Sequence, residues 1–189
     1  MNPLSHPFRP RAAAVFAGAP LLAGCVSVST PPPSPGAPTP PPLGFFSRIK
    51  VPDGYEPALR LSGRGVQIFR CETVGGEHLW RFRQPEADLT DDQGQLVARH
   101  GANFTFEHRD GSRLLATITA YDEAPGSGDL RWVLMSAKPF GNGAFASVTY
   151  VQRVNTHGGM PPPNCRADEA NQLLRVNFTA EFIFYRARH

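Results

Sequence analysis

Residues 146–165 read Ala-Ser-Val-Thr-Tyr-Val-Gln-Arg-Val-Asn-Thr-His-Gly-Gly-Met-Pro-Pro-Pro-Asn-Cys, which joins a β-type run to a Gly-Gly break, a proline-rich loop and a cysteine. In an extended chain, alternate side chains fall on opposite faces. One face would carry Ala146, Val148, Tyr150 and Val154, and the other Ser147, Thr149, Arg153 and Asn155. This alternation predicts a half-buried strand around which the rest of the domain is built.

The polar face of this strand leads into a candidate ligand site. Its side chains continue into Thr156 and His157, just before two glycines that let the backbone turn sharply. We predict that Arg153, Asn155, Thr156 and His157 are able to bind an anionic or sugar ligand. The structural alternative, which we favour, is that Arg153 and Asn155 hydrogen-bond the backbone of the loop at 161–164.

The pattern of turns and strands predicts an all-β domain over residues 51–189. Glycine-containing turn signals recur at nearly regular intervals, and no long amphipathic helix pattern lies between them. The cleanest strand pattern is the last one, in which an apolar face carries Val176, Phe178, Ala180, Phe182 and Phe184. We therefore expect an antiparallel β-sandwich or small β-barrel, with a β-trefoil as the alternative.

The first 24 residues have the features of an export signal. Arg9 and Arg11 precede an apolar stretch at 12–24, which is shorter than the roughly 20 apolar residues that a membrane-spanning helix needs. The stretch ends in Leu-Ala-Gly-Cys at 22–25, which resembles the lipobox of bacterial lipoproteins. The resemblance implies cleavage before Cys25, diacylation of its thiol and, because Val26 rather than Asp follows, delivery to the outer membrane. An ordinary signal peptide with an incidental cysteine is the alternative.

Residues 25–50 are expected to form a lipid-anchored, proline-rich linker. The part at 26–42 consists mainly of Pro, Ser, Thr, Ala and Gly and cannot bury a core, so we expect an extended spacer of about 3 Å per residue. Its expected role is to hold the domain off the membrane, and a peptide-recognition ligand is the alternative. Removal of Arg9 and Arg11 with the signal leaves a nearly neutral chain, so no nucleic-acid partner is expected.

The chain has three cysteines, and their number limits the disulfides. If Cys25 carries lipid, Cys71 and Cys165 remain, and in an oxidising compartment they have only one possible pairing. The chain-entropy model gives roughly 4 to 5 kcal/mol of stabilisation for a loop of this length. Two free buried thiols are the alternative.

Several segments, in order, resemble one family of secreted bacterial and fungal proteins, domain-of-unknown-function family 3455. They are Gly-Val-Gln-Ile-Phe-Arg-Cys at 65–71, Trp80, Pro-Glu-Ala at 85–87, His100, Asp-Gly-Ser at 110–112, Trp132, Gln-Arg-Val-Asn-Thr-His-Gly-Gly at 152–159, Cys165 and Phe-Tyr at 184–185. The chain departs from the family pattern at 103–106 and at Arg131. The resemblance implies the same domain from about residue 51 onward, but it brings no agreed activity.

The remaining motifs argue against a cofactor. Residues 141–146 read Gly-Asn-Gly-Ala-Phe-Ala and match a dinucleotide-binding fingerprint. A β-branched run follows them rather than the helix whose N-terminus would hold a pyrophosphate, so no NAD site is expected. His100, Glu107, His108 and Asp110 are close in sequence, but their spacing matches no known ligand pattern, so no metal is expected either.

Two classes of function remain open. The preferred one is a non-catalytic, lipid-tethered β domain that binds or organises a ligand or protein at the cell envelope. The alternative is an envelope hydrolase that acts on glycan or ester, in which Asp88, Asp92, Glu107 or Asp110 supply carboxylates and His100 or His157 acts as the base. Carboxylates at hairpin turns usually serve the turn itself.

Overall fold

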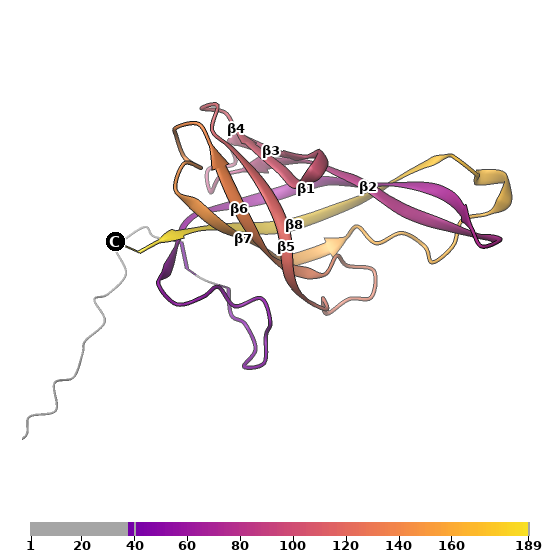
Figure 1. Cartoon of the computed structure of the whole chain (residues 1–189), viewed down its shortest axis with the longest axis horizontal. Coiled ribbons are helices and arrows are strands. Elements are labelled where there is room, and N and C mark those ends of the chain that lie inside the picture. Colours follow the sequence, from indigo (N-terminus) through magenta and orange to yellow (C-terminus); the bar gives the residue numbers. More distant parts are fainter. Residues whose placement is uncertain (1–37, 40, 189) are drawn as a thin grey trace, which may run out of the picture. The chain divides into compact units, whose positions relative to one another are not determined.

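The computed structural model describes residues 38, 39 and 41–188. Within them, eight antiparallel strands close into a barrel in which each strand pairs with the next and β8 pairs with β1 (Figure 1). The strands are β1 (Tyr55–Val74), β2 (Glu77–Thr90), β3 (Leu96–Gly101), β4 (Thr105–His108), β5 (Arg113–Asp122), β6 (Trp132–Phe140), β7 (Val148–Gly158) and β8 (Leu173–Ala187), with 3-10 turns η1 (Ala102–Phe104) and η2 (Ala167–Glu169). The all-β antiparallel prediction is confirmed, and the barrel is the form that it takes.

The predicted signal peptide, Cys25 and most of the predicted linker lie outside the described residues. In the part of the chain that is described, no helix has the length and apolar character needed to cross a membrane.

The barrel closes where the aromatic face of β8 meets glycines of β1. Phe178, Ala180 and Phe182 point inward, and Gly63 and Gly65 lie opposite Ala180 and Phe178 in the β1–β8 register. A Cβ atom on Gly63 would lie 2.5 Å from Cε2 of Phe182. Only a glycine therefore leaves room for the ring, and the predicted inward face of β8 is confirmed.

A second apolar cluster covers part of the outside of the barrel. Ile49, fully buried, packs with Val154, Ile183 and Tyr185, whose side chains point outward from β7 and β8. Polar contacts secure this cover: Nε2 of Gln152 donates to the carbonyl of Ile49 at 2.6 Å, and the hydroxyl of Tyr185 donates to Oε1 of Gln152 at 2.5 Å. The end of the segment predicted as linker therefore packs against the barrel.

The alternation predicted for 146–155 is wrong for this strand. Register shifts interrupt β7 between Val148 and Tyr150 and again between Val154 and His157. Val148 consequently faces the interior, whereas Tyr150 and Val154 face outward. Val154 is buried and Tyr150 half-buried because the cover around Ile49 hides the outer face, so the pattern of apolar residues did not distinguish inside from outside.

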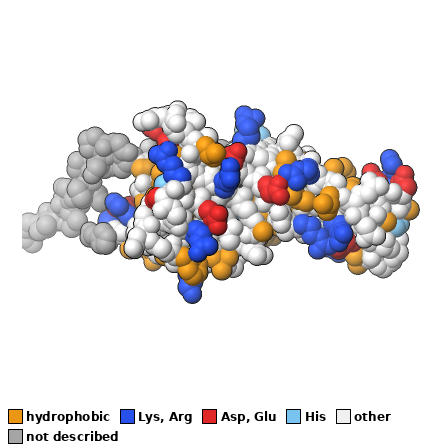
Figure 2. All heavy atoms as spheres, turned by 90° about the horizontal axis from the view of Figure 1, so that it is seen from above, with side chains coloured by type: hydrophobic (Ala, Val, Ile, Leu, Met, Phe, Trp, Pro, Cys, Tyr) orange, Lys and Arg blue, Asp and Glu red, His pale blue; other side chains and the backbone are white. Residues whose placement is uncertain are grey.

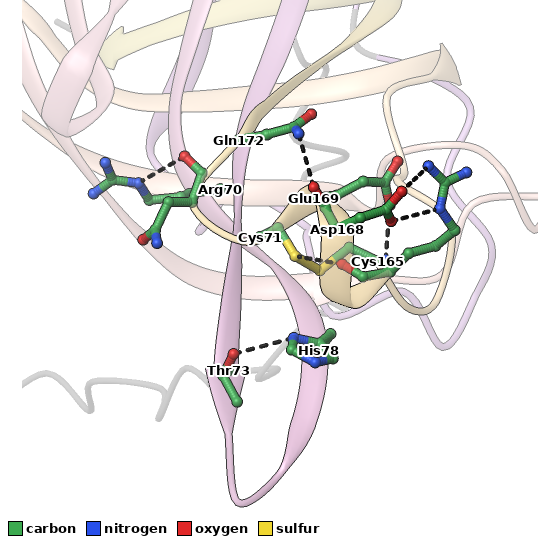
Figure 3. Close-up of a disulfide and its surroundings, with 10 residues drawn as sticks. Arg70, Cys71, Thr73, His78, Cys165, Asp168, Glu169 and Gln172 are labelled. Carbon is green, nitrogen blue, oxygen red and sulfur yellow. Dashed lines mark hydrogen bonds and ion pairs between the residues drawn. A yellow bond between two sulfur atoms is a disulfide. The ribbon is translucent and has the colours of Figure 1, made fainter.

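β1 and β2 continue past the barrel as a two-stranded ribbon, and the loop between β7 and β8 lies beside it (Figure 1). Cys71 and Cys165 form a disulfide between ribbon and loop, with their Cα atoms 5.9 Å apart, which confirms the predicted pairing (Figure 3). Backbone hydrogen bonds flank it, from Cys165 N to His78 O at 3.0 Å and from Asn171 N to Cys71 O at 2.9 Å.

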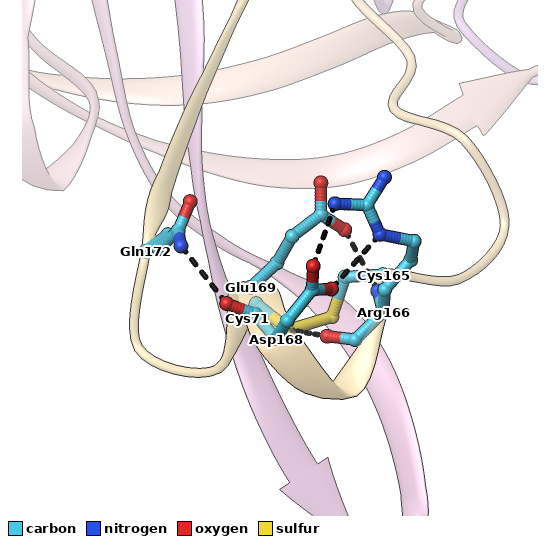
Figure 4. A network of polar contacts seen from close by, with 6 residues as sticks. All are labelled: Cys71, Cys165, Arg166, Asp168, Glu169 and Gln172. Atoms are coloured by element: carbon cyan, nitrogen blue, oxygen red, sulfur yellow. Dashed lines mark hydrogen bonds and ion pairs between the residues drawn. A yellow bond between two sulfur atoms is a disulfide. The ribbon is translucent and has the colours of Figure 1, made fainter.

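Polar contacts within the loop hold its shape next to the disulfide (Figure 4). The guanidinium of Arg166 donates to both carboxylate oxygens of Asp168 at 2.9 Å, and its backbone N–H donates to Oε2 of Glu169 at 2.7 Å. Gln172 Nε2 donates to the carbonyl of Asp168 at 3.0 Å. The loop is thus preformed where the cystine joins it to the ribbon.

Removing the disulfide should lower stability without changing the fold. In the double variant Cys71→Ala/Cys165→Ala, we expect the free energy of unfolding in urea to fall by roughly 4 kcal/mol, because the unfolded chain regains the entropy of a long loop. The circular-dichroism spectrum before unfolding should stay that of the parent, since the bridge lies on the ribbon rather than in the barrel core. The Cys25→Ala variant is the matched control, and a double variant as stable as this control would contradict the expectation.

Candidate functional site

A polar hollow, which we call the outer groove, lies on the outside of the barrel across β1, β2, β7 and β8. Its volume is about 630 Å³. The side chains that line it are mainly hydroxyl, amide, imidazole and charged groups: Ser62, Arg64, Asp88, Thr90, Asn155, His157, Thr179 and Glu181. Two of the residues that the sequence singled out, Asn155 and His157, therefore lie in one site.

Two glycines of β1 flank Arg64, one of the groove residues. Ser62 and Arg64 point outward, and Gly63 and Gly65, which alternate with them, take inward positions. A Cβ atom on Gly65 would lie 2.0 Å from the carbonyl oxygen of Glu86 and 2.6 Å from Cβ of Ala87. At Gly65 the backbone of β1 thus lies closer to β2 than any residue with a side chain would allow.

A β-bulge orients the two groove residues of β7. Val154 lies opposite Glu181 and His157 opposite Thr179, so β7 uses one more residue than β8 between these pairs. Asn155 takes up the difference with a φ of 49°, in the left-handed region. The extra residue reverses the alternation, so that Asn155 and His157 are both exposed at the groove while Thr156 between them is buried.

Charged residues of opposite sign alternate along one outer row of the barrel. In the strand registers, Arg64 lies opposite Asp88, Asp88 opposite Arg99, and Arg99 opposite Glu107. Arg99 Nε is 3.4 Å from Asp88 Oδ1, whereas Arg64 forms no ion pair with any residue that the structure describes. Figure 2 shows acidic and basic side chains next to one another rather than gathered by sign. Such pairs stabilise neighbouring strands and leave Arg64 available.

Arg153 and Thr156 point into the barrel, away from the outer groove. Nη2 of Arg153 donates to the carbonyl of Arg131 at 3.0 Å, and Oγ1 of Thr156 donates to the carbonyl of Leu130 at 2.5 Å. The alternative proposed for Arg153 and Asn155 is therefore wrong in its partner. Arg153 and Thr156 bind the backbone of residues 130–131 and not of 161–164, and Asn155 lies in the outer groove. The four residues singled out by the sequence do not form one site.

His100 is a core residue. Its ring stacks on Phe106 with centroids 4.1 Å apart, and Nδ1 donates to the carbonyl of Thr105 at 2.9 Å. Burial, together with the nearby charge of Arg153, lowers the pKa of His100 to about 3. The imidazole is consequently neutral at physiological pH, with its proton on Nδ1.

Asp110 secures one end of the barrel. One carboxylate oxygen accepts from the backbone and hydroxyl of Ser112 at 2.9 and 2.6 Å, and the other accepts from the backbone of Ala144 at 2.7 Å. These hydrogen bonds hold the pKa of Asp110 well below its ordinary value. They join the β4–β5 turn to the loop that carries Phe145, whose buried ring stacks on Phe184 at 4.8 Å.

The candidate acid and base residues do not converge on one centre, although Asp88 and His157 both line the outer groove and Asp88, His100 and Glu107 line a neighbouring hollow. Glu107 lies on the outer row, Asp110 at the barrel end, His100 in the core and His157 in the outer groove. Among residues 38, 39 and 41–188, no three His, Cys, Asp or Glu side chains are grouped so as to hold a metal ion.

Sequence reasoning missed Ser62, Arg64, Thr90, Thr179 and Glu181 as groove residues. Their signal was weak, because each looks like an ordinary outward residue of a half-solvated strand. The flanking glycines at 63 and 65 were the available clue, since glycine inside a strand marks a close approach of backbone. The residues of the neighbouring strands that complete the groove could not be predicted, because the register between strands is not apparent in the amino-acid sequence.

Comparison with known proteins gives one match. The model of a family described as "Protein of unknown function (DUF3455)" matches residues 52–186. No curated protein and no solved structure matches the chain.

The burial of His100 predicts a specific loss of stability on acidification. Because its folded-state pKa lies below that of the unfolded chain, its contribution is complete above about pH 6.5 and is lost as the pH falls toward 3. Between pH 7 and pH 5 the free energy of unfolding should drop by about 2 kcal/mol from this group. Urea unfolding at pH 7 and at pH 5 measures this drop in the free energy of unfolding. A His100→Phe variant should lose most of this slope and the groove variant His157→Ala should keep it; equal slopes in all three proteins would count against the assignment.

Proposed function

The chain belongs to the family described as Protein of unknown function (DUF3455), and we propose that it is a non-catalytic binding domain held at the cell envelope. In this proposal Cys25 carries the lipid anchor, the proline-rich linker spans the distance from the membrane, and the outer groove binds a polar envelope ligand such as a glycan chain. The observation that carries the proposal is the bulge at Asn155, which turns two polar side chains of β7 into the groove.

The conformation of Asn155 supports a role in binding. A non-glycine residue with a φ of 49° is uncommon, and such strained positions are retained where the surroundings or the function demand them. Here the bulge brings the amide of Asn155 and the imidazole of His157 beside the hydroxyls of Ser62, Thr90 and Thr179. A hydroxyl both donates and accepts hydrogen bonds, and an amide or a neutral imidazole offers one group that donates and one that accepts. This combination of donors and acceptors matches the hydroxyls of a sugar.

The charges of the groove favour a ligand without strong net charge. Asp88 is paired with Arg99 at 3.4 Å, and Glu181 with Arg60 at 3.3 Å. Arg64 is left as the single groove cation without an ion pair among the described residues. A mixed, mostly neutralised surface of this kind selects by hydrogen bonding rather than by charge.

The same pairing supports binding rather than hydrolysis. A hydrolase would need an acid and a base converging on one bond. The two carboxylates of the groove are instead engaged by arginines, and His157 makes no hydrogen bond to either of them. The other candidate base, His100, is buried and bonded to backbone.

The tether is tested by fractionation of the cells that make this protein. The wild-type chain should sediment with membranes and begin, by mass spectrometry, at an acylated Cys25. Cys25→Ala should remove it from the membrane fraction, because acyl chains contribute about 0.8 kcal/mol per buried CH₂ and nothing else in the proposal holds it there. Cys71→Ala is the matched control and should stay membrane-bound. An unprocessed N-terminus, or a Cys25→Ala protein that still sediments, would contradict the tether.

Binding in the groove is tested with the strained residue itself. Asn155→Gly should keep or raise the melting temperature, since glycine adopts positive φ without strain, yet weaken co-sedimentation with purified peptidoglycan sacculi about fivefold, the value of one hydrogen bond. His157→Ala should weaken it similarly. His78→Ala, on the distant ribbon, is the control. Unchanged binding by both groove variants would reject the site, and release of soluble glycan fragments would favour the hydrolase instead.

A further inference from the structure

A second pocket, which we call the end pocket, opens into the barrel where β5 ends and β6 begins. It has a volume of about 400 Å³ and shares no residue with the outer groove. Its walls are mainly apolar and come from Ile118, Tyr121, Leu130, Val133 and Met160, together with Arg131 and the buried Arg153. A pocket of this size and lining is within the range of small-molecule sites, about 300 to 1,000 Å³.

The end pocket exists because β4 is too short to cover β5. The two strands pair only from Thr105 to Glu107 on β4 and from Arg113 to Leu115 on β5. Farther along β5, a bulge between Ile118 and Ala120 lets Ile118 and Tyr121 pair with inward residues of β6, namely Met135 and Val133. Ile118 is nevertheless 39% exposed and Tyr121 38% exposed. Ile118 and Tyr121 thus remain partly exposed, although the guanidinium groups of Arg48 and Arg131 lie over the ring of Tyr121.

Arg153 reaches this pocket from β7, where it lies between Val133 and Phe182 in the strand registers. Only 8% of the residue is exposed. Its side chain makes one hydrogen bond, to the carbonyl of Arg131, and its Nε, which is buried, has no hydrogen-bond partner. It forms no ion pair with any described residue. An ionised group held out of water without a counter-charge is costly, so an anion in the pocket would be strongly favoured.

The other cation of the pocket is already neutralised. Nε of Arg131 is 3.0 Å from Oε1 of Glu123, and its guanidinium lies over the ring of Tyr121 at 4.4 Å. The rim therefore offers no second free charge, and Arg153 is the one cation of the end pocket without a carboxylate partner among the described residues. The ligand that fits has one anionic group at its inner end and an apolar chain toward the opening.

We propose that the end pocket binds a fatty carboxylate. The carboxylate accepts hydrogen bonds from the guanidinium of Arg153, whose planar donors match its two oxygens. The alkyl chain lies against Ile118, Tyr121 and Met160, whose exposed apolar surface it covers. This binding is independent of the outer groove, and it gives the barrel a second ligand class, an amphiphile, beside the polar one.

The test is calorimetric titration of the full-length chain carrying Cys25→Ala, which removes any acyl chain of its own, with dodecanoate in monomeric solution. One dodecanoate should bind per chain, and dodecanol should bind roughly 10- to 100-fold more weakly, the value of a hydrogen bond to a charged group. The Arg153→Met variant, with an unbranched apolar side chain in place of the guanidinium, should bind dodecanoate more weakly than the parent by the same factor. Arg131→Met should change the affinity less than about threefold, because its charge is exposed and paired.

Equal binding of dodecanoate and dodecanol, or undiminished binding by Arg153→Met, would overturn the proposal. Equal or tighter binding of lysophosphatidylcholine, which has a chain but no free carboxylate, would overturn it as well. If Arg153→Met does not fold, Ile118→Trp tests the same site by filling the pocket while leaving Arg153 in place, and it should abolish dodecanoate binding. Retained binding by Ile118→Trp would place the ligand elsewhere.

Discussion

The packing of the β8 aromatic rings against glycines of β1 is the contact on which the barrel depends. Phe182 occupies the space that a side chain at position 63 would take, and Phe178 lies opposite Gly65. An antiparallel sheet whose edge strands pair with each other leaves no edge exposed. β1 and β8 pair to close the sheet, and glycine at position 63 leaves room there for the ring of Phe182.

The same stretch of β1 also lines the outer surface. Arg64 points outward between Gly63 and Gly65 and is one of the residues of the outer groove. The bulge at Asn155 completes it from the other side. The strand that closes the barrel thus also lines the candidate binding site, and a larger residue at position 65 would clash with the backbone of β2.

Two arrangements of buried polar groups in the domain differ in how their hydrogen bonds are satisfied. Gln152, Tyr185 and the backbone of Ile49 satisfy one another, and burial raises the pKa of the Tyr185 hydroxyl to about 12, so this network stays neutral and secures the outer cover. Arg153 is buried too, and burial lowers its pKa to about 10, so it remains charged at neutral pH with a single backbone partner. The hydrogen bonds of the first arrangement are satisfied within the protein, whereas the charge of Arg153 would be balanced only by a bound anion.

The amino-acid sequence by itself determined that the chain is an antiparallel all-β domain, that Phe178, Ala180 and Phe182 face the core, and that Cys71 pairs with Cys165. These features follow from local alternation, turn residues and the number of cysteines, all of which are properties of neighbouring residues or simple counts. Only the tertiary structure decided which face of β7 is inside. Two bulges reverse its alternation, and a covering segment around Ile49 makes both faces apolar, so Arg153 enters the barrel while Asn155 and His157 stay outside. The reason is that a bulge is imposed by the register of the partner strand, which the sequence of β7 does not contain.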